Sequence, residues 1–154
     1  MMRRREFCLS IASALIMPVN AIGADLPHMV VHKDPNCGCC GAWVDAMRAA
    51  GFTDTVKENA SINKVKRALG VPSELQSCHT AEIGGYVIEG HVPPDEVKRL
   101  LASAPKAKGL SVPGMPIGSP GMEVPGAKPD TYAVILFGAE APATFAQYVG
   151  SARL

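Results

Sequence analysis

The sequence predicts an α/β protein whose elements follow the order β-α-β-α-β-β-α. Segments with the spacing of a strand alternate with segments of helical spacing between residues 29 and 101. Gly84 and Gly85 separate two short apolar runs, which is typical of a β-hairpin. Pro93 and Pro94 then open an amphipathic segment, as prolines do at the start of a helix.

The first half of this order is a β-α-β-α series. A short buried strand is predicted at 29–32, and a helix begins after Gly41 and stops at Gly51. A weak strand follows at 55–57, and a second helix, capped by Ser61, carries apolar residues as far as Leu69.

The second half is a hairpin and a closing helix. The predicted strands are 78–83 and 86–91, and the helix after Pro94 carries Val97, Leu100 and Leu101 on one face. This order is the plan of thioredoxin and glutaredoxin, in which the site lies between the first strand and the first helix. The start of the third strand packs beside that site, so Cys78 is expected to approach the cysteines at 37–40.

The remaining residues depart from that plan. Residues 105–129 hold six prolines, five glycines and two methionines without periodicity, and they repeat Pro-Gly-Met at 113–115 and 120–122. A loop of this length in a small domain is usually functional or disordered. A further strand is predicted at 132–137, and Pro142 is predicted to open a short C-terminal helix.

The N-terminus has the pattern of an export signal. Three arginines at 3–5 precede an apolar stretch at 7–19, and small residues follow at Ala21 and Ala24. We therefore predict an export signal over 1–24 and a single periplasmic domain over 25–154, with no stable membrane span after cleavage. The sequence leaves open a twin-arginine or an ordinary Sec signal. The net charge of +1 argues against nucleic acid as a partner.

The motif at residues 37–40 is Cys-Gly-Cys-Cys, at a predicted helix N-terminus. Unpaired N–H groups there favour thiolates, which serve both disulfide exchange and soft metals. Exported cysteines usually form structural disulfides, but three cysteines within four residues argue against simple pairing. Exchange needs two sulfurs, so Cys39 favours the metal interpretation, with Cys78 as a fourth ligand.

Two methionines and two histidines extend this candidate metal site. Met115 and Met122 carry thioethers, which select Cu(I), although they could instead dock the loop onto the core. Met29 and Met47 fit apolar patterns and are predicted to be core residues. His91 is the first candidate among the histidines and His79 the second, because neighbours in an extended strand, such as Cys78 and His79, point to opposite faces.

Five segments together resemble the bacterial copper-resistance CopG family. They are 37–40, 77–80 (Ser-Cys-His-Thr), 86–93, 109–116 and 118–123, in that order along the chain. The resemblance covers about residues 28–137. It implies a thioredoxin-like fold, a periplasmic location and copper ligands at the matching cysteine, methionine and histidine positions.

The leading hypothesis is a periplasmic copper-binding protein for copper resistance. Seven donors exceed what one Cu(I) ion uses, so we predict a cysteine-bridged site with more than one copper, and Cu(I)/Cu(II) redox activity is left open. The expected partners are copper ions and other periplasmic copper-handling proteins. The alternatives are a periplasmic thiol–disulfide oxidoreductase and a zinc-binding or disulfide-stapled domain. The candidate donors are Cys37, Cys39, Cys40, Cys78, His91, Met115 and Met122, with His79 as an eighth.

Overall fold

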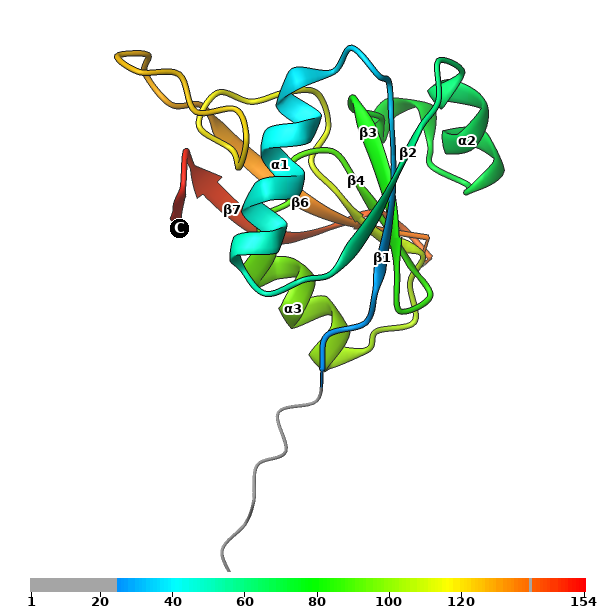
Figure 1. The fold of residues 1–154 in the computed structure, drawn as a ribbon. Helices are drawn as coiled ribbons and strands as arrows, with labels where there is room; N and C mark the ends of the chain where they lie inside the picture. The colour runs from blue at the N-terminus through cyan, green and yellow to red at the C-terminus, as the bar shows by residue number, and fades with distance from the viewer. Residues whose placement is uncertain (1–24, 139) are drawn as a thin grey trace, which may run out of the picture.

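The protein is a mixed α/β structure built on one eight-stranded sheet (Figure 1). The computed structural model describes residues 25–138 and 140–154. The predicted export signal over 1–24 lies outside the described residues. The helices are α1 (Gly38–Ala49), α2 (Ile62–Ala68) and α3 (Pro94–Ser103), with a single 3-10 turn, η1 (Ser73–Leu75). The strands are β1 (Met29–Lys33), β2 (Asp54–Glu58), β3 (His79–Ile83), β4 (Tyr86–Glu89), β5 (Gly109–Ser111), β6 (Thr131–Phe137), β7 (Ala143–Val149) and β8 (Ala152–Arg153).

The strand register brings the predicted site together. The sheet order is β2-β1-β3-β4-β5-β6-β7-β8, with β1 parallel to β2 and antiparallel to β3. Lys33, the last residue of β1, lies opposite His79, the first residue of β3. The chain that leaves β1 toward α1 and the chain that enters β3 therefore meet at one end of the sheet.

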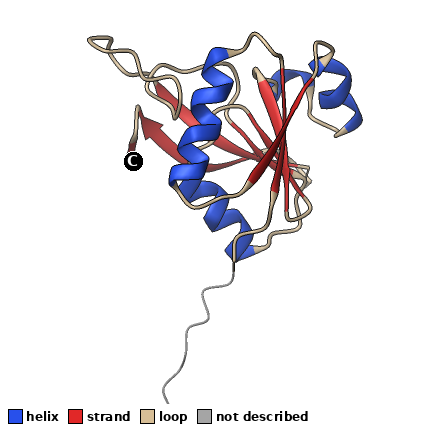
Figure 2. Cartoon of the chain, viewed as in Figure 1, coloured by secondary structure: helices blue, strands red, loops and turns tan. Residues whose placement is uncertain are grey.

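Helices lie on both faces of the sheet (Figures 1 and 2), and two clusters of apolar side chains pack there. The larger cluster joins α1 and α3 to one face, through side chains such as Trp43 and Leu100, both 0% exposed. Met29 and Met47 belong to it, which confirms their prediction as core residues. The smaller cluster lies on the other face and contains Val87.

The predicted C-terminal helix is wrong. Residues Ala143–Val149 form strand β7, which pairs antiparallel with β6. Phe145, Tyr148 and Val149 have helical spacing, but this segment is rich in aromatic and β-branched residues, which also suit a strand. Pairing decided the outcome: Tyr148 lies opposite Tyr132, and their rings stack with centroids 5.5 Å apart.

Two smaller differences bear on the site. Helix α1 begins at Gly38 rather than after Gly41, so Cys39 and Cys40 lie within its first turn. The long loop between α3 and β6 contains strand β5, which pairs with both β4 and β6 and anchors the loop in the sheet. Over the residues that the structure describes, every helix is too short or too polar to cross a membrane.

Candidate metal centre

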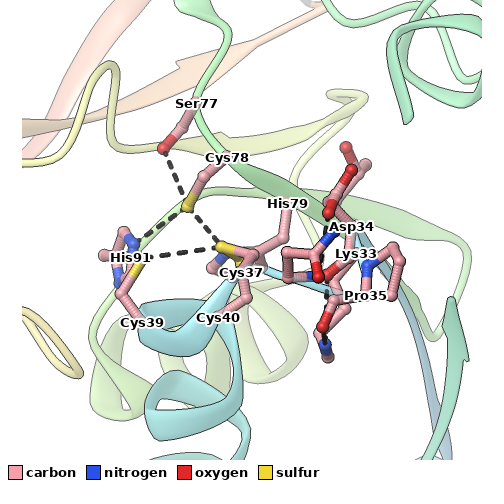
Figure 3. The surroundings of a disulfide bond; sticks show 12 residues. Lys33, Asp34, Pro35, Cys37, Cys39, Cys40, Ser77, Cys78, His79 and His91 are labelled. Atoms are coloured by element: carbon pink, nitrogen blue, oxygen red, sulfur yellow. Dashed lines mark hydrogen bonds between the residues drawn. A yellow bond between two sulfur atoms is a disulfide. The ribbon is translucent and has the colours of Figure 1, made fainter. Parts of the chain in front are cut away.

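Two of the four clustered cysteines are bonded to each other. Cys37, the N-cap residue of α1, forms a disulfide with Cys40 in the first turn, and their Cα atoms are 5.4 Å apart (Figure 3). The expectation that the spacing disfavours pairing is therefore wrong for these two. The early start of α1 is the reason, since residues three apart on a helix lie on the same face.

The other two cysteines, Cys39 and Cys78, are free and half-buried. The Cys39 sulfur lies 3.5 Å from that of Cys37. All four sulfurs, including that of Cys78 from the neighbouring strand end, lie within 4.8 Å of one another. The structure thus brings together the four cysteines that the sequence suggested.

Cys78 also contacts both candidate histidines. Its sulfur is 3.0 Å from His91 Nε2 and 3.3 Å from His79 Nδ1 (Figure 3). Strand alternation does not separate Cys78 from His79, because β3 begins at His79 and Cys78 lies in the bend before it. Cys78 therefore belongs to two groups of potential ligands, the four cysteines and the set of Cys78, His79 and His91.

The hydrogen bond of His91 determines its tautomer. His91 Nδ1 lies 2.8 Å from the carbonyl oxygen of Pro120, which can only accept, so Nδ1 carries the proton. Burial lowers the pKa of His91, which favours the neutral ring. In that ring Nε2 presents its lone pair toward Cys78. Metal-binding histidines commonly donate their other ring N–H to a carbonyl in this way.

His79 is buried more deeply. Its ring lies 4.4 Å from that of Trp43 and 5.0 Å from that of His91, centroid to centroid. Burial, followed by the nearby His91 and Lys66, holds the pKa of His79 well below its ordinary value. Among the described residues, its Nε2 atom has no hydrogen-bond partner. The contact through Nδ1 with Cys78 is therefore the polar interaction that orients this ring.

The thiol of Cys78 is protonated in these surroundings. Burial, followed by the nearby Cys39, raises the pKa of Cys78 to about 11. A bound cation reverses this preference, because a coordinating thiol loses its proton. Cys78 and the two neutral imidazoles thus form a set of neutral groups in which a cation would displace the thiol proton.

Residues 113–122, which we call the strap, cover this end of the sheet. Gly121 packs against the first two turns of α1: a Cβ at this position would lie 2.6 Å from Trp43 N and 2.9 Å from the Cys39 oxygen. The Ser77 hydroxyl donates to the Gly114 carbonyl, which ties the strap to the chain before Cys78. Met122 is half-buried in the strap, whereas Met115 is 54% exposed.

Comparisons with known proteins agree with this geometry. The sequence profile of a protein family of unknown function, DUF411, matches residues 75–122, the segment from Cys78 to the strap. No curated protein matches the chain. Two solved structures of a copper resistance protein, CopG, recorded as form 2 and form 1, are each 40% identical to it, with a TM-score of 0.75. The match to form 2 covers 80% of this chain and 98% of the CopG chain, and the match to form 1 covers 81% of this chain and 99% of the CopG chain.

The chain belongs to the CopG family. In this chain the fold brings together the Cys-Gly-Cys-Cys motif, the segment around Cys78 and the segment around His91 from separate elements. The mixed α/β architecture matches that of the CopG structures.

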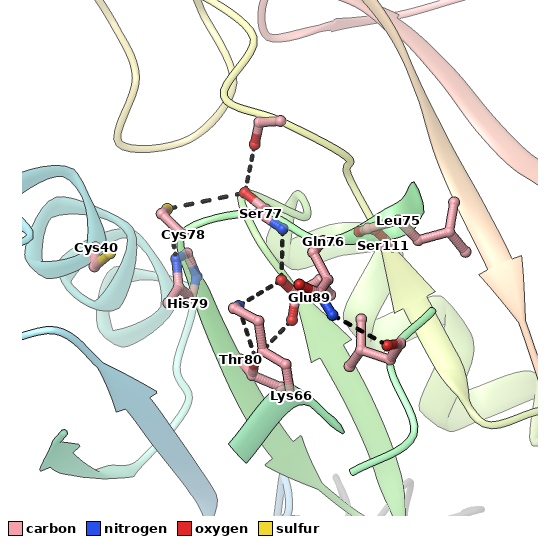
Figure 4. A network of polar contacts seen from close by, with 12 residues as sticks. Cys40, Lys66, Leu75, Gln76, Ser77, Cys78, His79, Thr80, Glu89 and Ser111 are labelled. Carbon is pink, nitrogen blue, oxygen red and sulfur yellow. Dashed lines mark hydrogen bonds and ion pairs between the residues drawn. The ribbon is translucent and has the colours of Figure 1, made fainter. Parts of the chain in front are cut away.

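Sequence reasoning missed a buried polar cluster beside this candidate site. Lys66 and Glu89 form an ion pair with side chains 1% and 0% exposed (Figure 4). Two sequence signals pointed to it. Lys66 lies among the apolar positions of α2, and Glu89 follows the apolar residues of β4 as the last residue of that strand.

The two buried histidines predict a pH dependence of stability. Their folded-state pKa values are lowered below 6.5, so below that pH the unfolded chain binds more protons than the folded protein. The unfolding free energy of the metal-free disulfide form should therefore fall as the pH drops from 7 to about 5.5, by up to ~1.4 kcal/mol per pH unit for each histidine. Urea unfolding across this range measures the slope. His79→Gln cannot be protonated and should reduce the slope to the contribution of His91, and an unchanged slope in that variant would contradict the assignment.

Proposed function

We propose that this protein binds copper for copper resistance, in a site made by the two ligand groups that share Cys78. The observation that carries the proposal is the convergence of four sulfurs and two neutral imidazoles within hydrogen-bond or near-contact distances. Relatives at 40% identity are named copper resistance proteins. The predicted ligands are the eight donors named from the sequence.

The donor types favour Cu(I) over zinc. Thiolate and thioether sulfur are soft ligands that suit Cu(I), whereas thioether adds little to a zinc site. The strap carries Met122 next to Gly121, which touches the first turn of α1. We propose that Met122 closes the site from the strap and that the more exposed Met115 is its outer ligand.

The number of donors supports a cluster rather than a single ion. Cys78 is common to both ligand groups, which supports a bridging role for its sulfur. A bridging thiolate shares its charge between cations, and crowded thiolates are then less destabilised by mutual repulsion. We propose a cysteine-bridged site with more than one copper, in which Cu(I)/Cu(II) redox change accompanies storage.

The disulfide makes copper uptake dependent on reduction. While Cys37 and Cys40 are bonded, two of the four sulfurs are unavailable as thiolate ligands. Reduction by a dithiol consumes two electrons and two protons, breaks the S–S bond and leaves two thiols, while the dithiol becomes a disulfide. Cys39, Cys78 and the histidines remain as donors in the disulfide form.

We expect the reduced protein to hold more than one Cu(I) per chain, and both the disulfide form and the Cys78→Ser variant to hold fewer, because each loses bridging sulfur. Native mass spectrometry of the copper-loaded protein counts the ions, and competition with a Cu(I) chelator beside a zinc titration measures preference. Met29→Leu is the control, because it removes a sulfur from the apolar core at the start of β1, away from the cysteines, and it should change neither value. A single copper that survives Cys78→Ser would contradict the cluster, and zinc retention without Cu(I) affinity would contradict the metal.

A thiol–disulfide oxidoreductase is the second candidate. The Cys37–Cys40 disulfide at the start of α1 favours it, since this is where exchange enzymes carry their pair. One observation counts against this candidate. Such enzymes have a cis-proline at this position, where this chain has Ser77 and Cys78, and the described residues contain no cis peptide bond. Turnover of a dithiol with a protein disulfide, undiminished by Cys78→Ser, would favour exchange over copper binding.

The strap should tune copper affinity through His91. Gly121→Ala places a Cβ against α1 and displaces Pro120, whose carbonyl orients His91. Loss of such an outer partner typically costs about 10–100-fold in metal affinity, and we expect a fall in Cu(I) affinity of that size. Gly126→Ala is the control, because Gly126 has a similar positive φ of 78° but no atom within 4 Å of its Cβ position. Equal effects of the two variants would show that backbone strain alone, and not the contact, matters.

We also propose a thioredoxin-like classification for a single domain over 25–154. The element order and the strand order β2-β1-β3-β4 support it, with β3 antiparallel to β1. Export to the periplasm would place this domain among other copper-handling proteins, which are its proposed partners.

We expect the protein in the periplasmic fraction of fractionated cells, because residues 1–24 have the pattern of an export signal. Replacing Arg4 and Arg5 by Lys distinguishes the two routes: a twin-arginine substrate stays in the cytoplasm, and a Sec substrate is still exported. Recovery of the unaltered protein from the cytoplasm alone would contradict export.

A further inference from the structure

A buried ion pair lies on the α2 side of the sheet, directly behind the candidate copper site. Lys66 Nζ of α2 is 2.6 Å from Glu89 Oε1 at the end of β4. Thr80 of β3 links the two, since it accepts from Lys66 Nζ at 3.0 Å and donates to Glu89 Oε2 at 2.6 Å. The pair therefore joins α2 to β3, which begins at His79, and to β4, which ends two residues before His91.

The same carboxylate holds the chain that carries Cys78. The backbone N–H of Ser77 donates to Glu89 Oε1 at 2.6 Å (Figure 4). Ser77 immediately precedes Cys78, and Glu89 stands two residues before His91. One carboxylate thus connects the chain segments that carry Cys78 and His91. The potential donor atoms of these residues, Cys78 Sγ and His91 Nε2, are 3.0 Å apart.

The packing around this connection is close. Gly90 lies between Glu89 and His91 with a φ of 72°, and a Cβ there would be 2.5 Å from Ser77 Cβ and 2.6 Å from the Val112 oxygen. The Gly90 backbone therefore lies against the Ser77 side chain, and two hydrogen bonds link the segments, from Ser77 N–H to Glu89 and from Gly90 N–H to the His79 carbonyl at 3.0 Å.

Stability alone does not explain a charged pair at this place. Burying two charges has a large desolvation cost, and well-packed apolar residues of similar volume are often as stable or more stable. Ile62 and Val65 are half-buried on α2, and Leu69 packs against the smaller apolar cluster, so α2 has apolar contacts of its own. An apolar pair would lack one property of Glu89, the acceptor for the Ser77 N–H.

We propose that Glu89 and Lys66 are positioning residues of the copper site: Glu89 holds Cys78 against His91 through the Ser77 amide, and Lys66 balances the carboxylate charge. The proposal rests on the proposed copper function, and it assigns to these residues a role that the ligand set does not contain. It predicts that the acceptor at position 89, rather than the charge, controls copper binding.

Two double variants without the charges separate these roles. Lys66→Met with Glu89→Gln removes both charges and keeps an acceptor for Ser77, whereas Lys66→Met with Glu89→Met removes the acceptor as well. We expect the Met/Met variant to unfold in urea at the same or a higher midpoint than the Met/Gln variant. Its Cu(I) affinity, measured by chelator competition in the reduced protein, should be lower by about 10–100-fold.

A second measurement works without metal. In the disulfide form of the chain carrying Cys8→Ser and Cys39→Ser, Cys78 is the single free thiol. Its alkylation rate by iodoacetamide should rise roughly fivefold in the Met/Met variant relative to Met/Gln, the factor expected from losing one hydrogen bond of ordinary strength. Because both variants lack the two charges, their comparison reflects the position of Cys78 rather than a change in local charge.

The outcomes are distinct. Equal copper affinity and equal alkylation in the two variants would overturn the positioning role, and so would a Met/Met variant that does not fold, because the pair would then be a structural requirement. Copper affinity lost equally in both variants would assign the effect to charge and overturn the role of the acceptor. If the unaltered protein takes up no Cu(I), the copper function fails, and the alkylation rates still decide whether Glu89 positions Cys78.

Discussion

The register of β1 against β3 is the constraint on which the site depends. Lys33 lies opposite His79, so the residues that follow β1 and those that precede β3 must occupy the same end of the sheet. Cys37 and Cys78 are the chemically important residues of those two segments. A shift of this register by two residues would move Cys78 by about 7 Å along the strand, which exceeds the spread of the sulfurs.

Without a metal ion, the potential ligands of the site favour their neutral forms. Burial favours the protonated thiol of Cys78 and the neutral rings of His79 and His91. Under the proposed function, a soft cation compensates for the loss of the thiol proton and accepts the lone pair of His91 Nε2. The disulfide adds a second control, because it withholds two sulfurs until they are reduced. In the proposed copper function, metal binding, proton release and thiol oxidation state are coupled at one place.

Residues outside the ligand set also form hydrogen bonds that orient the site. Pro120 fixes the tautomer of His91 from the strap, and Glu89 fixes the backbone before Cys78 from β4. Gly121 and Gly90 allow these two approaches, since a side chain at either position would collide with backbone or with Ser77. Such contacts matter because a metal site tolerates only small displacements of its ligands.

The sequence by itself determined the element order through β4 and α3, the core positions of Met29 and Met47, and the meeting of Cys78 with the cysteine motif. These follow from local periodicity and from the few ways in which a β-α-β unit and a hairpin can pack. Only the tertiary structure decided that 143–149 is a strand, since its spacing fits both periods and pairing with β6 selects one. It also decided that Cys37 bonds to Cys40 and that Lys66 faces Glu89, because bonds between residues depend on where a helix begins and which face it turns to the sheet. Local pattern reports which face of each element is apolar, and the polar contacts around Cys78 arise only where several elements come together.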